Sequence, residues 1–360
     1  MKKKILFSPG ISKKVVGGAE YQMSLLAKYL EREEHSIYGI LKENLRNEAK
    51  YENLFLTQKS MLQTWFKFTY SRKIYRYLKQ IKPDIIYQRG ELPYLAVGCY
   101  YKKKHGGKTI WHISSKGCVS RFHFRFGFSL FGYIDKKFAD YSIRNVDYII
   151  AQTHDQNELL KKNYGRESDL VVPNFDKLPQ DEISKSPPLR VVWISNIKPI
   201  KKAECFIPLA QEFEGRKDIR FVMIGREGSR SYQEKIDRMI SGMTNVEYLG
   251  EISHEEVNAF LGKSHILVNT SLSEGFPNTF IQAWMRKVPV VSLYVDPDGI
   301  LRKNKIGFCS GSIEQMIDDV KQLTDNKELR EEMGERAQEY AFEKHTFEEN
   351  MAKIVDLIFP

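Results

Sequence analysis

The chain has 360 residues, 42% of them hydrophobic and 28% charged, with a formal net charge of +10. This length favours two domains, and 23 glycines, 13 prolines and four scattered cysteines exclude a low-complexity or disulfide-rich chain. The short apolar run at the start does not suit a signal peptide, and no apolar run approaches the roughly 20 residues that cross a bilayer, so we expect a cytoplasmic protein.

The first half alternates short apolar runs with helical segments. Lys4–Phe7 is a predicted strand, Ala19–Glu33 has the apolar spacing of a helix, and Ser36–Leu41 is a second strand. Three more apolar runs follow at 83–87, 108–113 and 146–151. This alternation predicts an α/β domain in which parallel strands are joined by crossover helices.

Two glycines, Gly17 and Gly18, stand between the first strand and its helix. Glycine lets a backbone approach a ligand closely, and the start of a helix favours a phosphate. A plain glycine-rich turn is the alternative. On these two residues alone that alternative is favoured.

Polar residues end two strands of the first half. His112 ends the run at 108–113, where it could donate a hydrogen bond to a ligand; a structural histidine is the alternative. Arg89 ends the run at 83–87, and Lys116 follows His112. Both cations could meet an anionic ligand.

A proline-rich polar stretch at 171–190 predicts a linker, after which the pattern starts again. Strands are predicted at 190–197, 219–225, 246–249, 266–269 and 288–293, with helices at 203–214 and 231–241 between them. We expect two open parallel sheets that face each other across a cleft, with ligands at the carboxyl ends of the strands. From about Ser312 the tail predicts two or three amphipathic helices, the last at Phe347–Phe359.

The most informative stretch is Ser271–Val291, where a strand, a sharp turn and a helix follow one another. The first N–H groups of such a helix suit a phosphate, and Glu274 and Gln282, eight residues apart, could hold two ends of a polyhydroxy ligand. The other candidate ligand-binding residues of this turn are Gly275, Phe276, Pro277, Asn278 and Thr279. An ordinary buried strand–helix unit is the alternative.

These motifs resemble the retaining glycosyltransferases of family 4, which have the GT-B fold. Ser271–Val291 resembles the E-x7-E signature of that family, with Glu274 as the first glutamate and Gln282 in place of the second. Gly17–Glu20 and Val171–Asp176 also resemble family segments. The resemblance implies that Glu274 holds the donor sugar, that the Gly17–Gly18 loop faces the donor diphosphate and sugar, and that His112 lies near the reacting sugar. There His112 could donate to a sugar hydroxyl or orient the acceptor, and Arg89 and Lys116 could meet an anionic acceptor.

The same resemblance places a cationic clamp for the diphosphate after the first strand of the second half. Lys201 matches the family lysine, whereas Asn196 stands where the family has arginine and Lys202 where it has glycine. We expect Lys202 or Arg226 to supply the missing charge. Gln282 would accept from the ribose hydroxyls that the family's second glutamate holds, without the charge that strengthens such bonds.

The family implies an acceptor-binding Rossmann-like domain at 1–178 and a nucleotide-sugar-binding one at 179–344, with a C-terminal helix at about 345–360 that packs back on the first. No HxH, HExxH or DxD pattern follows a strand, so we expect no metal and no cofactor. A metal-independent enzyme neutralises the leaving diphosphate with lysine, arginine and helix ends.

Charge is unevenly distributed along the chain. Residues 1–188 hold 33 lysines and arginines against 19 acidic residues, while residues 189–360 hold 23 against 27. In Met61–Lys82 and Ser120–Phe138 the cations alternate with aromatic residues, which suits an anionic membrane surface. A packed helical face with snorkelling lysines is the alternative, and no nucleic-acid motif is present.

Together these features predict a retaining, metal-independent glycosyltransferase, of the hexosyl type. Its partners would be a nucleotide sugar and a saccharide or lipid-linked acceptor in bacterial-type cell-surface polysaccharide or glycolipid synthesis. It would be cytoplasmic, or peripheral on the cytoplasmic face of a membrane. A nucleotide-sugar epimerase of the same fold and a non-catalytic, glycan- or partner-binding descendant are the alternatives.

Overall fold

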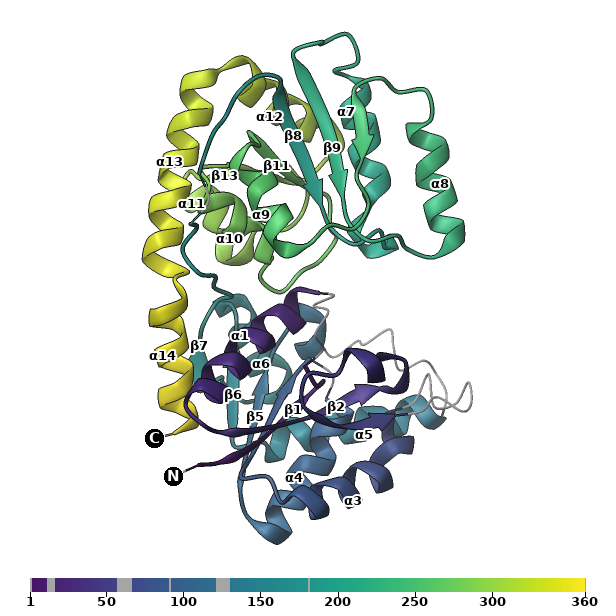
Figure 1. Cartoon of the computed structure of the whole chain (residues 1–360), viewed down its shortest axis with the longest axis vertical. Coiled ribbons are helices and arrows are strands. Elements are labelled where there is room, and N and C mark those ends of the chain that lie inside the picture. The colour runs from purple at the N-terminus through teal and green to yellow at the C-terminus, as the bar shows by residue number, and fades with distance from the viewer. Residues whose placement is uncertain are drawn as a thin grey trace. The chain divides into compact units, whose positions relative to one another are not determined.

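The computed structural model describes residues 2–11, 17–56, 67–90, 92–120, 130–180 and 182–359 (Figure 1). Two compact units make up the chain. The first comprises residues 1–173 together with 351–360, and the second comprises residues 174–350. Residues 61–66 and 121–129, which belong to the two basic aromatic segments, lie outside the described part.

The first unit is built on a parallel sheet of seven strands in the order β3-β2-β1-β4-β5-β6-β7. The strands are β1 Lys4–Ser8, β2 Ser36–Lys42, β3 Glu52–Leu56, β4 Ile85–Arg89, β5 Lys108–His112, β6 Tyr148–Ala151 and β7 Leu170–Val171. Its helices are α1 Gly18–Arg32, α3 Ser71–Ile81, α4 Pro93–His105, α5 Leu130–Asn145 and α6 His154–Tyr164, with 3-10 turns at Glu43–Glu48, Lys67–Tyr70 and Lys116–Val119.

Helices cover both faces of this first sheet (Figure 1). On one face α3, α4 and α5 pack against alternate strand residues such as Leu6, Ile86 and Trp111. The opposite face carries Phe7 and Tyr87, whose rings lie 5.4 Å apart. The C-terminal residues belong to this unit as well, and Phe359 stacks on His35 at 4.8 Å.

The second unit repeats the design with six parallel strands in the order β10-β9-β8-β11-β12-β13. They are β8 Leu189–Ile194, β9 Ile219–Ile224, β10 Val246–Tyr248, β11 Ile266–Asn269, β12 Val290–Ser292 and β13 Gly307–Cys309. The helices are α7 Phe206–Gln211, α8 Arg230–Ile240, α9 His254–Gly262, α10 Asn278–Trp284, α11 Ile300–Lys303, α12 Ile313–Asp325 and α13 Lys327–Lys344, with 3-10 turns at Pro199–Lys201, Ala203–Cys205 and Pro297–Gly299. The last helix, α14 Phe347–Ile358, begins in this unit, and its residues from Met351 onward belong to the first unit.

The predicted α/β class with two parallel sheets is confirmed. Most predicted strands are present within two or three residues of their expected ends. The helix expected over 203–214 is instead a 3-10 turn at Ala203–Cys205 followed by the short α7. The strands β3, β7 and β13 were not predicted. The strand order reverses between β1 and β4 in the first sheet and between β8 and β11 in the second. In open parallel sheets, such a reversal opens a crevice at the carboxyl ends of the two strands that flank it.

At the carboxyl end of the second sheet, the loops after β8 and β9 touch through their backbones. Gly225 has φ +156°, and a Cβ on it would lie 1.7 Å from the carbonyl oxygen of Ser195. Across the same contact, the Ile197 N–H donates to the Arg226 carbonyl at 2.9 Å. Only glycine lets the two loops come this close, since backbone atoms cannot give way as a flexible side chain would.

Replacing Gly225 should therefore destabilise the second unit. We expect Gly225→Ala to lower the free energy of unfolding by about 3 kcal/mol, because the added methyl overlaps a carbonyl. Gly215→Ala is the matched control, since its Cβ meets no described atom within 4 Å, and it should stay within about 0.5 kcal/mol of the parent. Urea unfolding of the three proteins measures both values. Equal stability of the two variants would contradict the steric account.

Candidate functional site

The loops after β8 and β11 flank the strand-order reversal of the second sheet and are tied together by a buried threonine. The Trp193 indole N–H donates to Thr270 Oγ1 at 2.8 Å, and the Thr270 hydroxyl donates to the Lys201 carbonyl at 2.7 Å. A backbone bond from Leu272 N–H to the Ile200 carbonyl, 2.9 Å long, adds a second link. These bonds fix the end of the Pro199–Lys201 turn against the start of the Ser271–Pro277 loop.

This arrangement brings Lys201 and Glu274 together as an ion pair. The Lys201 ammonium donates to Glu274 Oε1, and the Ser271 hydroxyl donates to the same oxygen at 2.8 Å. The two charged side chains are 22% and 18% exposed, so the pair is partly shielded from water. A charged hydrogen bond in such surroundings is stronger than one on an open surface. The two residues proposed to act on the donor sugar and its diphosphate thus lie in contact.

Gln282 lies one turn inside α10 and is buried. Its carboxamide NH2 donates to Asn258 Oδ1 at 2.9 Å and meets His254 Nε2 at 2.8 Å. His254 Nε2 also lies 3.7 Å from Asp176 Oδ2, and that carboxylate is buried as well. His254 and Asn258 are presented by α9, which starts with a capping box of Ser253 and Glu256. The glutamine is therefore held by two polar partners on α9, one of which lies close to Asp176.

Lysine stands at position 202 in a backbone conformation that suits glycine better. Lys202 has φ +49°, the left-handed conformation that favours glycine, and the family has glycine here. Its ammonium lies 3.6 Å from Glu204 Oε1, and Lys235 lies 3.6 Å from the same atom. Burial opposes ionisation of Glu204, but the hydrogen bond from Tyr232 and the two lysines outweigh it and lower the pKa of the carboxyl. Two cations thus share one carboxylate.

The arginine of the family clamp falls on Asn196, and Arg226 lies in the adjacent loop at the same end of the sheet. Asn196 is half-buried after β8, and Arg226 is half-buried after β9. The bond between Ile197 N–H and the Arg226 carbonyl places their loops side by side. Because the two loops are in contact, Arg226 is a candidate for the positive charge that Asn196 does not supply.

The turn before α10 is supported from below by residues that the sequence did not single out. Phe276 is buried, with its ring 6.2 Å from Trp284 and 4.8 Å from His345. The Asn174 amide donates to the Phe276 carbonyl at 2.6 Å, and His345 Nδ1–H donates to the Asn174 carbonyl at 2.7 Å. The side chain of Phe276 therefore stabilises the turn. Gly275 and Pro277 are buried too, whereas Asn278 and Thr279 are half-buried.

In the first unit, Gly17 precedes α1 in an extended conformation, with φ −155°. A Cβ on Gly17 would meet no described atom within 4 Å. The packing of the described residues therefore does not require glycine here. Gly18, the first residue of α1, is exposed.

His112 ends β5 and is buried beside Tyr87 and Arg89. Its Nδ1 lies 2.6 Å from the Tyr87 hydroxyl and 3.1 Å from Arg89 Nη1. Burial, and then the Arg89 charge, hold the pKa of His112 well below its ordinary value. Since Arg89 can only donate, Nδ1 accepts and the neutral ring carries its proton on Nε2. That Nε2 is buried and has no partner among the described residues.

The two candidate acceptor-binding cations have different surroundings. Arg89 is fully buried, and burial lowers the pKa of its guanidinium to about 10. Lys116 is half-exposed and pairs with Asp155 at 2.6 Å. An anionic acceptor would have to displace Asp155 from this lysine.

The described residues contain neither a membrane-spanning helix nor a cluster of metal-binding side chains. No helix in the described part of the chain is long and apolar enough to cross a membrane. Among the same residues, no group of three or more histidine, cysteine, aspartate or glutamate side chains is placed to hold a metal ion.

Comparison with known proteins gives the family. Residues 16–175 match the family model described as Glycosyltransferase Family 4, and residues 188–326 match the model described as Glycosyl transferases group 1. The chain belongs to the group 1, family 4 glycosyltransferases. The predicted family is thereby confirmed.

Two curated proteins are similar to parts of this chain. The poly(ribitol-phosphate) alpha-N-acetylglucosaminyltransferase of Staphylococcus aureus is 28% identical over 234 residues, which are 62% of this chain and 46% of that protein. One component of human phosphatidylinositol N-acetylglucosaminyltransferase is 26% identical over 225 residues, 58% of this chain and 46% of that one. This family 4 chain thus spans about half the length of the curated relatives it matches.

A solved structure confirms the GT-B fold. HepE of Anabaena, crystallised with UDP and glucose, superposes with a TM-score of 0.77 at 15% identity, covering 99% of both chains. At that identity the likeness concerns the fold alone.

His345 makes the support beneath the family 4 motif sensitive to acid. Burial lowers the pKa of His345 from 6.5 to about 4, although the bond to Asn174 opposes this shift. The unfolded chain therefore binds a proton first as the pH falls. The contribution of neutral His345 to the free energy of unfolding is fully present above about pH 6.5. It falls by about 3 kcal/mol as the pH drops from about 6.5 to 4.

We expect His345→Gln to lose stability less steeply than the parent between neutral pH and mild acid. Urea unfolding at several pH values measures the slope. His154→Gln, which changes an exposed histidine, is the control and should keep the parent's slope. An unchanged slope in His345→Gln would show that the buried ring does not cause the acid sensitivity.

Proposed function

We propose that this chain is a retaining glycosyltransferase that moves a sugar from a nucleoside diphosphate sugar to a saccharide or lipid-linked acceptor. The observation that carries the proposal is the contact of Lys201, Glu274 and Ser271 at the strand-order reversal. A cation for phosphate and an oriented carboxylate for sugar hydroxyls are the two groups that recognition of a sugar diphosphate requires. Both come from adjacent loops at the place where ligands of such sheets bind.

In this proposal, Lys201 leaves Glu274 when the donor binds and turns to the diphosphate. A diphosphate carries more negative charge than one carboxylate and competes well for the ammonium. In the described contacts Ser271 and Lys201 both use Glu274 Oε1. We assign Oε2 to a hydroxyl of the donor sugar. The hydrogen bond from Ser271 keeps the carboxylate in place after Lys201 has moved.

Gln282 takes the ribose. Its NH2 group is engaged with Asn258 and His254, which leaves the amide oxygen to accept from a ribose hydroxyl. Lys202 and Arg226 supply further positive charge to the diphosphate in place of the family arginine at Asn196. Gly17 and Gly18 let the backbone before α1 come close to the junction of sugar and phosphate.

The chemistry that the family implies is a displacement on one face of the sugar. The acceptor hydroxyl attacks the anomeric carbon on the side from which the diphosphate leaves, and a diphosphate oxygen takes its proton. The protein then positions the reactants and stabilises the leaving charge. Neutral His112, with its proton on Nε2, donates to an oxygen of the donor sugar or the acceptor.

An acceptor that carries phosphate is the form we favour. The first half of the chain holds 33 cations against 19 acidic residues. The names of the two curated relatives specify poly(ribitol-phosphate) and phosphatidylinositol, and both contain phosphate. Both names also specify transfer of N-acetylglucosamine, so UDP-N-acetylglucosamine is the first donor to test. Such acceptors favour cell-surface polysaccharide or glycolipid synthesis at the cytoplasmic face of a membrane.

The test is calorimetric titration with UDP and other nucleoside diphosphates and with their sugars, without added metal. Tight binding of one nucleotide sugar would name the donor and support the transferase. Binding with exchange of a sugar proton into solvent and no need for an acceptor would support the epimerase alternative. If nothing binds, the non-catalytic alternative is correct.

We expect Lys201→Met to weaken nucleoside diphosphate binding about thirtyfold, because a charged hydrogen bond contributes about 2 kcal/mol. Glu274→Gln should keep that affinity within about threefold and lower kcat about a hundredfold, since it removes charge where the sugar reacts. Lys263→Met, at an exposed lysine of the same unit, is the control for Lys201→Met. Loss of diphosphate affinity in both lysine variants alike would contradict the assigned role.

A further inference from the structure

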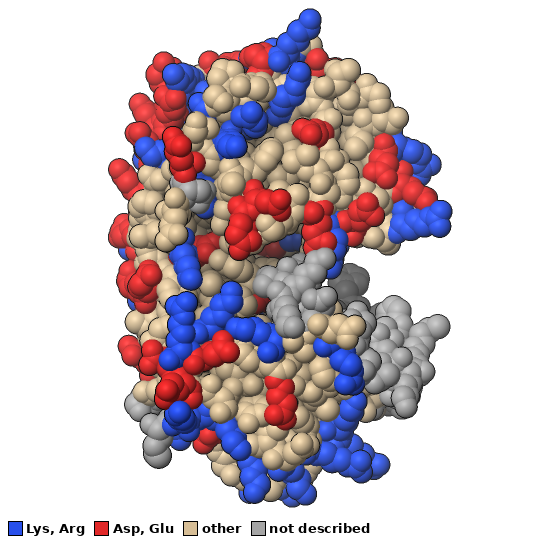
Figure 2. All heavy atoms as spheres, viewed as in Figure 1, with Lys and Arg blue, Asp and Glu red and all other residues tan. Residues whose placement is uncertain are grey.

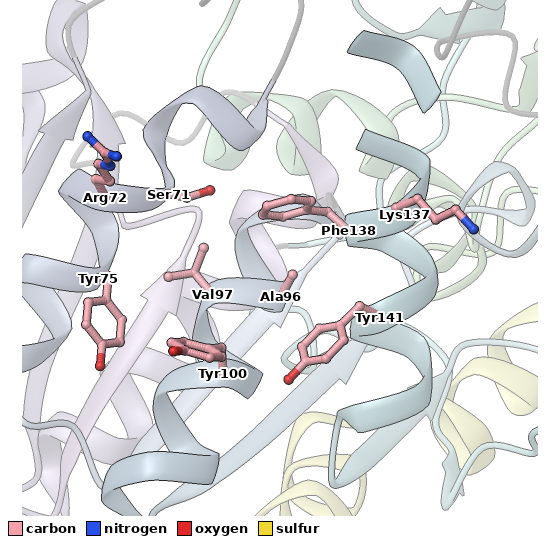
Figure 3. Close-up of a pocket in the computed structure, with 9 residues that line it drawn as sticks. All are labelled: Ser71, Arg72, Tyr75, Ala96, Val97, Tyr100, Lys137, Phe138 and Tyr141. Carbon is pink, nitrogen blue, oxygen red and sulfur yellow. The ribbon is translucent and has the colours of Figure 1, made fainter. Parts of the chain in front are cut away.

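The first unit has a pocket that contains none of the residues assigned to glycosyl transfer. It lies between α3, α4 and α5 and has a volume of about 480 Å³. Its lining is almost wholly apolar and is made by Ser71, Arg72, Tyr75, Ala96, Val97, Tyr100, Lys137, Phe138 and Tyr141 (Figure 3). A volume of this size falls in the range of cavities that bury small organic ligands.

The walls of the pocket are held in place by their own contacts. Ala96 and Val97 on α4 form the floor, with Tyr75 of α3 on one side and Phe138 of α5 on the other (Figure 3). The Tyr75 hydroxyl bonds to His105 Nε2 at 3.2 Å, and its ring lies 5.7 Å from that of Tyr100. These contacts hold the Tyr75 side chain at the side of the pocket, so that it does not fold into the pocket.

Positive charge surrounds this apolar pocket. The three helices hold ten lysines and arginines against two aspartates, which is most of the net charge of the chain. Arg72 and Lys137 stand at the rim (Figure 3), and Lys104 lies 5.0 Å from the Tyr100 ring centroid. In Figure 2 the lysines and arginines gather along the lower margin of this unit, over α3 and α4.

We propose that this pocket binds one acyl chain of an anionic phospholipid, and so docks the first unit on a bilayer that contains such lipids. The aliphatic floor and aromatic walls suit a hydrocarbon chain, and Arg72 and Lys137 at the rim suit the phosphate above it. Single-stranded nucleic acid would need rings stacked along a basic groove. Here the rings enclose a pocket with an aliphatic floor, which favours the lipid.

This inference goes beyond sugar transfer and concerns a different face of the unit. The helices α3, α4 and α5 cover one face of the sheet, whereas the Tyr87 ring lies on the opposite face with Phe7. Lipid binding can therefore be removed by substitutions that leave the candidate donor residues untouched.

The test is cosedimentation of the full chain with vesicles of phosphatidylcholine mixed with phosphatidylglycerol, and with vesicles of phosphatidylcholine alone. We expect binding to the anionic vesicles only. Tyr100→Glu, which places a carboxylate at a pocket residue that is 44% exposed, should weaken binding about tenfold. Tyr294→Glu, at a tyrosine of the second unit that is 49% exposed, is the matched control and should bind as the parent does.

Two further variants separate the pocket from general surface attraction. Ala96→Leu partly fills the floor without a change of charge and should weaken binding about fivefold, with an unchanged thermal midpoint as evidence of folding. The double variant Arg72→Glu with Lys137→Glu should weaken vesicle binding more than tenfold, because it reverses two charges at the membrane surface. Lys217→Glu with Lys263→Glu, at two exposed lysines of the second unit, is the charge-matched control.

Each outcome has a defined meaning. If the parent does not bind anionic vesicles at low salt, the proposal is wrong. If only charge reversals matter, with Tyr100→Glu and Ala96→Leu binding normally, the pocket takes no chain and the proposal fails. Loss of single-stranded RNA binding in the same variants, with no effect on vesicles, would also overturn it. Nucleotide calorimetry on these variants tests the transferase separately and should give the parent's affinity.

Discussion

The candidate site depends above all on one buried hydroxyl. Thr270 accepts from the Trp193 indole and donates to the Lys201 carbonyl, so it joins the loop after β11 to the interior of β8 and to the loop that follows it. Together with the backbone bond from Leu272 to Ile200, this link holds the loops of Lys201 and Glu274 against each other. A flexible lysine pairs with a carboxylate at a large cost in side-chain entropy. Because the Lys201 backbone is fixed, only the side chain remains to be ordered.

At this site, carboxylates hold the lysines in ion pairs. Glu274 holds Lys201, and Glu204 is shared by Lys202 and Lys235. This pairing keeps the neighbouring lysines from facing one another unscreened. A diphosphate would take over these ammonium groups, and Ser271 would still orient Glu274. The pairs are therefore compatible with the proposed binding of a diphosphate.

The sequence predicted the elements whose signal is local. The strand at Ile266–Asn269, its turn and α10 follow from an apolar run, Gly275 and Pro277, and a helical sequence. By contrast, β13 has three residues and β7 two, too few for a period to show. The helix expected at 203–214 is only partly present, because its first turn is 3-10 and α7 ends at Gln211.

The partners of the site residues required tertiary structure. His112 was singled out at a strand end, but its contact with Arg89 follows from the register of β4 on β5, which no sequence period specifies. Phe276 was expected to contact the donor, yet its side chain is buried against Trp284 and His345. Asn174 lay in a segment that resembles the family, but its bond to Phe276 spans 102 residues of sequence.

Gln282 departs from the family glutamate, and its surroundings suit an amide. A carboxylate at this position would set an oxygen against Asn258 Oδ1, where the glutamine places an N–H donor. It would also add a negative charge near Asp176, whose carboxylate lies 3.7 Å from the same His254 nitrogen that Gln282 contacts. Like charges in a buried network are costly, while a satisfied amide is not. The neighbours of Gln282 therefore suit a neutral amide. The missing charge at position 282 does not by itself indicate a site that has lost its ability to bind.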